Sequence, residues 1–171
     1  MRESIRSVTP IFNTHRMVKE YAERLYIPAG GACQELAGEN WRAALELSRW
    51  KSQMRKDWPQ VQIYDVKIGN DDRQNILVGE SLDVSAKLHL GPVGPQHVRV
   101  EAYHGEVEID GVRNPQVTTL HQVEHNDGNG HYLFRGSVPA SESGTYGFSV
   151  RVVPTHPHLM QEHELRLITW S

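Results

Sequence analysis

The chain has 171 residues, of which 38% are hydrophobic and 23% are charged, and it contains a single cysteine, Cys33. This length is enough for one ordinary domain, or for a modest domain with an appendage. One cysteine excludes a disulfide scaffold and a zinc cluster built from cysteines. No apolar run reaches the roughly 18–20 residues that a membrane span requires, and the first residues lack the apolar core of a signal peptide. We therefore expect a cytoplasmic protein with no membrane partner.

Charge is distributed unevenly along the chain. Residues 1–60 contain 10 Lys and Arg against 7 Asp and Glu, whereas residues 61–171 contain 8 against 14. The formal net charge of −3 gives no electrostatic reason to expect a nucleic-acid partner. The hydrophobic periodicity changes at the same point. The sequence therefore predicts two unlike pieces, a helical segment over residues 1–59 and a second domain over residues 60–171.

The first piece carries apolar side chains at helical spacing over residues 14–26. Asn13 and Thr14 are natural N-cap residues at its start, and Pro28 with Gly30-Gly31 is expected to end it. Five apolar residues form one stripe on this predicted helix: Met17, Val18, Tyr21, Leu25 and Tyr26.

A second helix is expected over about residues 33–58, with a break at Gly38-Glu39-Asn40 and a stop at Pro59. About sixty residues are a marginal basis for an independent core. The aromatic residues of this piece, such as Tyr21 and Trp41, should therefore pack against the second piece or against a partner.

The second piece alternates apolar and polar residues, which is typical of antiparallel strands with one solvated face. Turn residues such as Asp110-Gly111 separate the runs. The expected strands are residues 61–68, 82–90, 98–103, 107–109, 117–123, 132–138, 147–153 and 165–170. So many short strands in about 110 residues predict an all-β sandwich.

One local pattern favours an immunoglobulin-like version of this β-sandwich. The run Glu142-Ser143-Gly144-Thr145-Tyr146-Gly147-Phe148 is similar to the corner that precedes strand F, with Tyr146 as the corner tyrosine. Phe148 then occupies the place of the strand F cysteine, so an antibody-type domain is excluded.

The histidines invite a metal hypothesis, because nine of them follow residue 60. Residues two or four apart on a strand share a face without converging on one point, so we expect exposed histidines and no metal site. The combinations considered are His156 and His158 with His163, and His121 with His125 and His131.

No catalytic constellation stands out among the other reactive residues. Glu101, Glu106, Glu108 and Asp110 could supply paired carboxylates for glycoside hydrolysis, but their alternation more simply predicts a charged outer face. No serine lies in a nucleophile elbow, and no glycine-rich phosphate loop is present. Cys33 could have a lowered pKa at a helix start, but a buried small hydrophobe is expected. We therefore expect no catalytic, cofactor-binding or metal-binding residue.

Aromatic residues could form a platform on which a sugar ring stacks. The candidates are Trp50 and Trp58 with Tyr64, and Tyr103 with Tyr132. Aromatic residues in alternating strands or on a helical stripe usually belong to a core instead.

Both ends of the chain resemble the C-terminal part of bacterial and archaeal α-glucan phosphorylases of the glycogen and maltodextrin type. At the start the resemblance rests on residues 1–6, Phe12-Asn13-Thr14, Glu20-Tyr21 and Tyr26-Ile27-Pro28. At the end it rests on residues 144–154, on His156-Pro157 and on Leu167-Ile168-Thr169-Trp170.

This resemblance implies a glycosyltransferase family that transfers glucosyl units between α-1,4-glucan and phosphate, with pyridoxal phosphate on a lysine in a Gly-Thr-Ser motif. No such motif flanks the lysines of this chain, Lys19, Lys51, Lys56, Lys67 and Lys87. The cofactor lysine would lie upstream, so the resemblance implies a chain that is inactive alone and needs no cofactor itself.

Two interpretations remain open. In the first, the chain is a non-catalytic C-terminal fragment of such a phosphorylase, its partner is the upstream catalytic domain, and the sandwich has a structural or an interaction role toward glucan or protein. In the second, it is a stand-alone β-sandwich module that binds carbohydrate or protein. A fragment should expose its apolar helical stripe and self-associate through it, whereas a module should cover the stripe. The stripe residues are Met17, Tyr21, Leu25, Trp41 and Leu45.

Overall fold

The computed structural model describes residues 2–9, 11–69, 78–109, 111–125, 130–140 and 143–171. The chain divides into two compact units, Met1–Ser48 and Arg49–Ser171, and we describe each by itself. The first unit is helical, and the second consists of the end of a helix followed by a sheet of seven antiparallel strands.

The helical unit begins with α1 (Arg2–Val8) and α2 (Thr14–Tyr21). The predicted cap at Asn13 is confirmed, because its side-chain oxygen accepts a hydrogen bond of 2.8 Å from the backbone N–H of Arg16. This bond satisfies one of the backbone donors that a helix start leaves free. The helix predicted over residues 14–26 is therefore present, although its last turn is a π-turn, Ala22–Tyr26.

The predicted helix end at Pro28 and Gly30-Gly31 is wrong, because α3 (Ile27–Asp57) begins there and runs through these residues. The reason lies in the π-turn before it, in which the N–H of Ile27 bonds to the carbonyl of Ala22, five residues back. Pro28 has no backbone N–H and so cannot donate a helical hydrogen bond. It lies at the point where the π-turn ends and α-helical hydrogen bonding begins. The proline therefore falls in a first turn, where it is tolerated.

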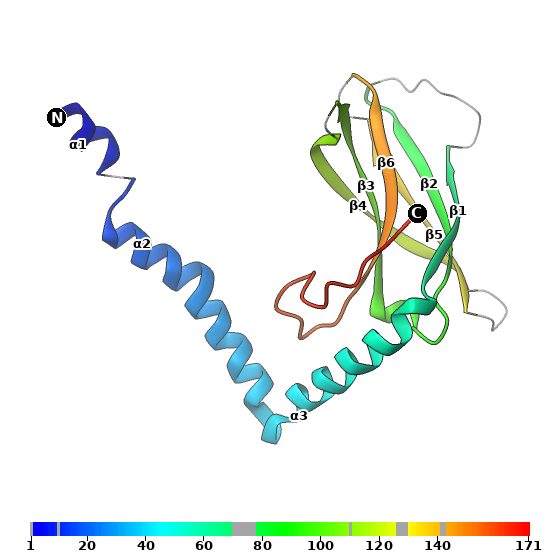
Figure 1. Ribbon diagram of the computed structural model, residues 1–171, viewed down its shortest axis with the longest axis horizontal. Coiled ribbons are helices and arrows are strands. Elements are labelled where there is room, and N and C mark those ends of the chain that lie inside the picture. The colour runs from blue at the N-terminus through cyan, green and yellow to red at the C-terminus, as the bar shows by residue number, and fades with distance from the viewer. Residues whose placement is uncertain (1, 10, 70–77, 110, 126–129, 141–142) are drawn as a thin grey trace. The chain divides into compact units, whose positions relative to one another are not determined.

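The predicted break at Gly38-Glu39-Asn40 is confirmed inside α3. Gly38 is extended, and Glu39, Asn40 and Trp41 all have positive φ angles of 48°, 58° and 66°. Left-handed backbone is unfavourable for residues other than glycine, and for a bulky side chain such as that of Trp41 it is a genuine outlier. The helical ribbon is interrupted at these residues (Figure 1).

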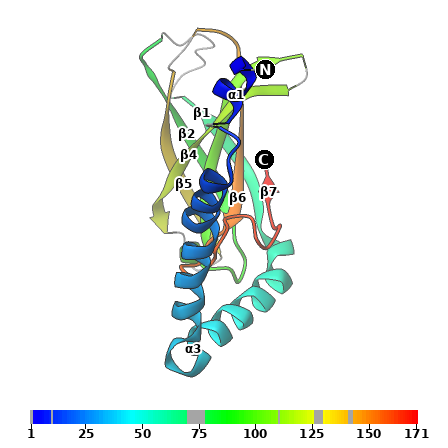
Figure 2. The same ribbon diagram turned by 90° about the vertical axis from the view of Figure 1, so that its left-hand side faces the viewer.

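The last turns of α3 belong to the β unit and lead into a short 3-10 turn, Trp58–Gln60, which contains Pro59. The strands that follow are β1 (Gln62–Ile68), β2 (Ser81–His89), β3 (Val98–Glu108), β4 (Gly111–His125), β5 (His131–Pro139), β6 (Tyr146–Pro154) and β7 (Thr169–Trp170). A further 3-10 turn, Pro95–His97, precedes β3. The strand order in the sheet is β1-β2-β5-β4-β3-β6-β7 (Figures 1 and 2).

Strand β4 is shared by two layers of the β unit. Its first part pairs with β3, from Gly111 opposite Glu108 to Leu120 opposite Val100. Its last part, residues 121–125, pairs with β5. The edge strands β1 and β7 come close to each other, so the sheet curls until it is nearly a barrel.

The core lies between the two layers, and alternation in each strand supplies it. In β2, Val84, Ala86 and Leu88 are buried, while the residues between them face outward. Met54 and Trp58 at the end of α3 join this core. The other buried members are Val61, Leu90, Val93, Val98, Val100, Ala102, Leu120, Phe134, Val138, Val150, Val152 and Leu165.

The predicted strands are present, but three of the boundaries are wrong. The strand expected over residues 117–123 is longer, because β4 begins at Gly111 and ends at His125. The strands expected at residues 98–103 and 107–109 are joined in one long strand, β3, because it pairs without a break with β6 through Gly105, and the bulge opposite Gly105 lies in β4 at Asn114-Pro115. Of residues 165–170, Thr169–Trp170 alone form a strand. The all-β, two-layered sheet is observed, whereas its assignment as immunoglobulin-like stays a prediction. Tyr146 begins β6 and is exposed, and Glu142 lies outside the described residues.

Candidate functional site

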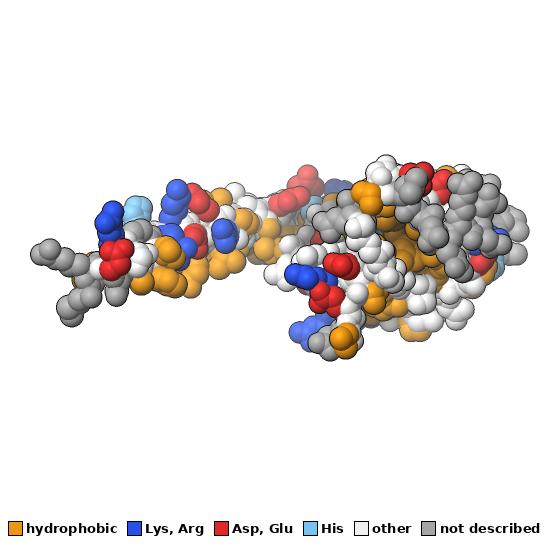
Figure 3. All heavy atoms as spheres, turned by 90° about the horizontal axis from the view of Figure 1, so that it is seen from above, with side chains coloured by type: hydrophobic (Ala, Val, Ile, Leu, Met, Phe, Trp, Pro, Cys, Tyr) orange, Lys and Arg blue, Asp and Glu red, His pale blue; other side chains and the backbone are white. Residues whose placement is uncertain are grey.

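The apolar stripe of the helical unit is exposed, as expected for a surface that packs against something else. Neither α2 nor the π-turn contains a buried residue. Leu25 is 56% exposed and Trp41 is also 56% exposed, and Met17, Tyr21 and Leu45 are exposed as well. Apolar side chains gather along one side of this unit and charged ones along the other (Figure 3). An apolar face of this kind is typical of an interaction surface.

A buried ion-pair network lies on the outer side of β3 and β6. Glu101 is 2% exposed although its neighbours Val100 and Ala102 face the core. Its two carboxylate oxygens accept hydrogen bonds from Arg99 Nε at 2.5 Å and from Arg151 Nε at 2.6 Å. Both oxygens are thereby occupied, which suits a carboxylate removed from water.

The network continues into the segment that follows β6. Arg99 Nη2 lies 3.0 Å from Glu162 Oε2, so each arginine charge is matched. Burial disfavours the charged guanidinium of Arg99, but the hydrogen bonds and charges of Glu101 and Glu162 outweigh it, and its pKa is raised. Lys51 pairs with Glu164 in the same segment. These ion pairs fasten the C-terminal segment to the strands and to the end of α3.

Two aromatic rings complete this outer face. The rings of Tyr103 and Trp170 meet edge to face, with centroids 5.5 Å apart and an interplanar angle of 89°. The guanidinium of Arg151 lies 5.5 Å from the centroid of each ring. A cation held between two aromatic rings stabilises this contact. Tyr103 therefore pairs with Trp170 rather than with Tyr132, which packs against the core.

The first candidate sugar platform is not assembled either. Trp58 is 6% exposed and belongs to the core. Trp50 packs against that core, where its indole N–H donates to His97 Nδ1 at 3.2 Å and its ring lies 4.7 Å from that of His156. Tyr64 is separate from both and is 53% exposed on β1. The usual role of aromatic residues, core packing, holds for the two tryptophans.

The histidines are spread over several surfaces. His156 and His158 lie together, with ring centroids 5.5 Å apart, but His163 is exposed beyond them. His121 is exposed on β4, and His131 pairs with His89 instead, at 4.7 Å. The side chain of His125 lies outside the described residues. Among the residues that the structure describes, no group of three histidine, cysteine or acidic side chains could hold a metal ion.

One histidine that the sequence did not single out is buried. His104 on β3 is 3% exposed, and its Nε2 lies 3.1 Å from the hydroxyl of Thr118. Removal from water lowers the pKa of His104, because the charged imidazolium is disfavoured there.

The remaining candidates do not converge on one site. Glu101 is enclosed by two arginines, Glu108 pairs with Arg113 at 2.8 Å, and Asp110 lies outside the described residues. The expectation of a buried Cys33 is wrong, because this residue is exposed. It lies within α3 rather than at a helix start, in a unit that offers it no core.

A hollow of about 610 Å³ lies on the outer face of β1, β2 and β5. We call it, together with the exposed Tyr64 on the same face, the β1–β2–β5 groove. Small residues form its floor, and the long side chains of Lys67 and Arg135 flank it. Its lining is Lys67, Gly69, Asp83, Val84, Ser85, Arg135, Gly136 and Ser137. Of the residues in this groove, the sequence indicates only Tyr64 as a candidate for sugar binding, because the strands that bring the others together are distant in sequence.

Close packing explains one of the small residues in this floor. A Cβ atom at Gly136 would lie 2.6 Å from Leu120 Cδ2 and 3.1 Å from the carbonyl oxygen of Thr119. The glycine is therefore required where β5 crosses the middle of β4.

The fold and these surfaces define a β domain with an attached apolar helical segment and no assembled catalytic site in the described residues. A family model for the glycogen phosphorylase C-terminal domain matches residues 58–171. The chain therefore belongs to the glycogen phosphorylase C-terminal domain family.

Curated relatives match almost the whole chain. It is 31% identical over 171 residues to glycogen phosphorylases of Mycobacterium tuberculosis and Mycobacterium bovis, a match that covers 99% of the chain and 20% of each relative. It is also 31% identical over 176 residues to maltodextrin phosphorylase of Thermococcus litoralis, again with 20% of the relative covered. The chain thus spans about a fifth of the length of these relatives, and the resemblance read from its two ends is confirmed.

Within the described residues, no helix is both long enough and apolar enough to cross a membrane.

Proposed function

We propose that the chain is the C-terminal, non-catalytic part of a cytoplasmic α-glucan phosphorylase that releases glucose 1-phosphate from α-1,4-glucan. Its family and the names of its relatives support this reading, since the match extends through the helical unit as well as the β unit. In this proposal the reaction takes place in an upstream catalytic domain.

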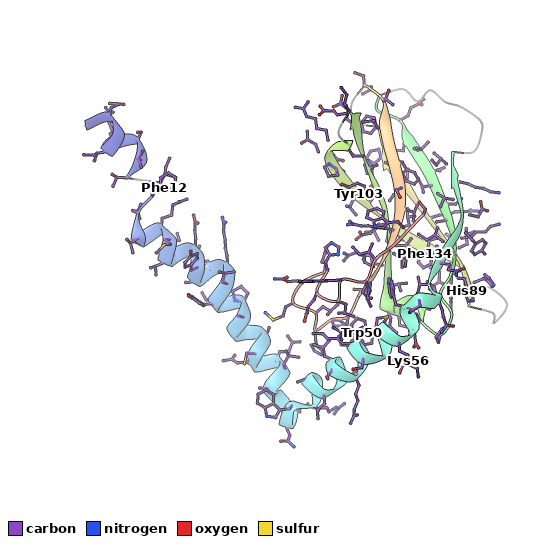
Figure 4. The ribbon with its side chains drawn as sticks, in the orientation of Figure 1. Phe12, Trp50, Lys56, His89, Tyr103 and Phe134 are labelled. Carbon is purple, nitrogen blue, oxygen red and sulfur yellow. The ribbon has the colours of Figure 1, made fainter. Side chains whose placement is uncertain are left out.

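The lysines of the chain do not fit a pyridoxal phosphate site. Such a site needs a lysine amine sheltered next to a phosphate-binding cradle. Lys19 is exposed beside Glu23, Lys51 is paired with Glu164, and Lys67 and Lys87 lie near Asp65. Lys56 is exposed on the last turns of α3 (Figure 4). The proposal therefore places the cofactor in the upstream domain.

The observation that carries the proposal is the exposed apolar stripe. Fully burying a large apolar side chain contributes about 1.5–3 kcal/mol, and the stripe contains several that have no cover within their own unit. A catalytic domain of the same protein is the cover we propose. The β unit has its own core, which suits a structural role or an interaction role toward glucan or protein. It could fill such a role attached to the catalytic domain or as a separate binding module.

The activity of the isolated chain tests the proposal directly. We expect no glucose 1-phosphate from maltodextrin and phosphate, with or without added pyridoxal phosphate, because none of the five lysines, all of them among the described residues, lies in a site that fits the cofactor. A longer protein, continued in frame upstream of Met1, should release it under the same conditions. Phosphorolysis by residues 1–171 alone, or an inactive extended protein that binds pyridoxal phosphate, would contradict the proposal.

A further inference from the structure

The outer face of β1, β2 and β5 places polar side chains in rows across three strands. Lys67, Ser85 and Arg135 are register partners and form one row. Asp83 opposite Ser137 forms the next row. All of these residues alternate with core residues such as Val84, so their side chains share the solvent side of the sheet.

Charges and hydroxyl groups in this floor remain available for a ligand. Within the described part of the chain, neither Asp83 nor Arg135 makes an ion pair, and both are exposed. The floor between them consists of Ser85, Ser137 and Gly136. An acidic acceptor, a guanidinium donor and hydroxyl groups around one hollow match the alternating donors and acceptors of a polyol. The volume of about 610 Å³ is typical of a small-molecule site.

The aromatic ring of Tyr64 lies farther along the same outer face of β1, β2 and β5. The Tyr64 ring meets the His131 ring edge to face, with centroids 5.6 Å apart, and His131 in turn contacts its cross-strand partner His89. His89 lies at the outside of the β unit, away from the core residue Phe134 (Figure 4). This contact holds Tyr64 while half of its surface stays open to solvent.

The distance between the two features sets the size of the ligand. His89 and Ser85 are four residues apart on β2, which is about 13 Å at about 3.3 Å per residue. Between them lies the row of Asp65, Lys87 and Leu133, in which Lys87 Nζ is 3.4 Å from Asp65 Oδ2. A single sugar ring cannot touch both the hollow and Tyr64, whereas a short oligosaccharide can.

We propose that the β1–β2–β5 groove binds a segment of α-1,4-glucan, with Tyr64 stacking on one glucosyl ring and Asp83 and Arg135 hydrogen bonding to the hydroxyl groups of others. The choice of α-glucan rests on the proposed function, while the choice of an oligosaccharide rests on the groove alone. The groove then acts as a tether that keeps polymer near an upstream catalytic domain.

Calorimetric titration of the full chain with maltoheptaose tests this proposal. Y64A and R135Q should each weaken binding roughly three- to tenfold, as expected when one stacking or polar contact is lost. Y146A and R113Q are matched controls, because both residues are exposed on the other layer of the sheet; these variants should bind as the parent does. Maltose should bind much more weakly than maltoheptaose, since it spans less of the groove.

Several outcomes would overturn the proposal. These are an absence of maltoheptaose binding by a folded chain, equal binding of cellohexaose, or tighter binding of glucose 1-phosphate in competition with maltoheptaose. Equal losses in the test and control variants would also overturn it, because they would report a general loss of folding. None of these results bears on phosphorolysis by the extended protein, so failure of the groove and failure of the proposed function are distinguishable.

Discussion

The two units of this chain place their large apolar side chains in opposite ways. In the β unit, Trp58 and Met54 are enclosed by strands of both layers. In the helical unit, Trp41 and Leu25 face solvent although α2 has a side-chain cap and an amphipathic pattern. A segment can therefore form regular helices without forming a hydrophobic core. Local sequence signals are enough for helices, but a core needs partners from elsewhere in the chain or from another protein.

Paired tryptophan variants should show the largest difference between the units. We expect Trp58→Ala to lower the free energy of unfolding of the β unit by about 3–5 kcal/mol, because it removes a large buried side chain. Trp41→Ala, at an exposed position, should change it by less than about 0.5 kcal/mol. Urea unfolding followed by circular dichroism measures both, and similar losses in the two variants would contradict the division described here.

Removal of the buried carboxylate should have the next largest effect. Glu101→Ala leaves Arg99 and Arg151 without their shared acceptor, and we expect a loss of about 1.5–3 kcal/mol, the range for hydrogen bonds to charged groups. Glu108→Ala, which removes an exposed ion pair with Arg113, should lose at most about 1 kcal/mol. The same unfolding measurement applies, and an unchanged stability of Glu101→Ala would mean that the network does not fasten the C-terminal segment.

The apolar stripe should make the isolated chain self-associate. In sedimentation velocity at high micromolar concentration, we expect species larger than the monomer, because two stripes can bury each other. Leu25→Lys should shift the distribution toward monomer, whereas Lys19→Gln on the charged side should leave it unchanged. Leu25→Lys should raise the apparent dissociation constant roughly tenfold above that of the parent chain, since about 1.5 kcal/mol of apolar burial is removed. A strictly monomeric parent chain would argue against the stripe as an interaction surface.

The smallest expected effect concerns pH. Burial lowers the pKa of His104 in the folded state below 6.5, its ordinary value. As the pH falls through that value, the unfolded chain takes up a proton that the folded chain does not, so the free energy of unfolding decreases. Above about pH 7 both states are neutral at this residue, and no change is expected.

His104→Gln should therefore lose less stability than the parent chain between pH 7 and pH 5. His163→Gln, at an exposed position, is the matched control and should keep the parent's pH dependence. Denaturant unfolding at several pH values measures the difference. If the free energy of unfolding depended on pH in the same way in His104→Gln and in the parent chain, His104 would be excluded as a source of acid sensitivity.

Local patterns predicted much of the fold. The cap at Asn13, the break at Gly38-Glu39-Asn40 and the alternation in β2 all depend on neighbours in sequence, and all are observed. The helix through Pro28 was missed because the π-turn before it has no clear sequence signature. The joining of two predicted strands into β3 was missed for a similar reason, since Gly105 resembles a turn in sequence and its place in a strand depends on pairing with the distant β6.

The surfaces were harder to predict, because they depend on long-range pairing. Glu101 keeps the apolar–polar alternation of β3, so the sequence alone predicts an exposed side chain, and its burial follows from the arginines packed around it. Its partner Arg151 is 50 residues away and comes next to it through the pairing of β3 with β6. The hollow beside Arg135 likewise needs three strands in register. The exposed stripe, in contrast, was predicted, since the parts of it before and after the break at Gly38 each lie within a short stretch of helical sequence.

Strand β4 has a consequence for how the β unit comes apart. The first part of β4 pairs with β3 and its last part pairs with β5. If either layer separates, the other therefore loses backbone hydrogen bonds to β4. The tight crossing at Gly136 and Leu120 joins the layers at their shared strand. The β unit is thus expected to unfold in one step.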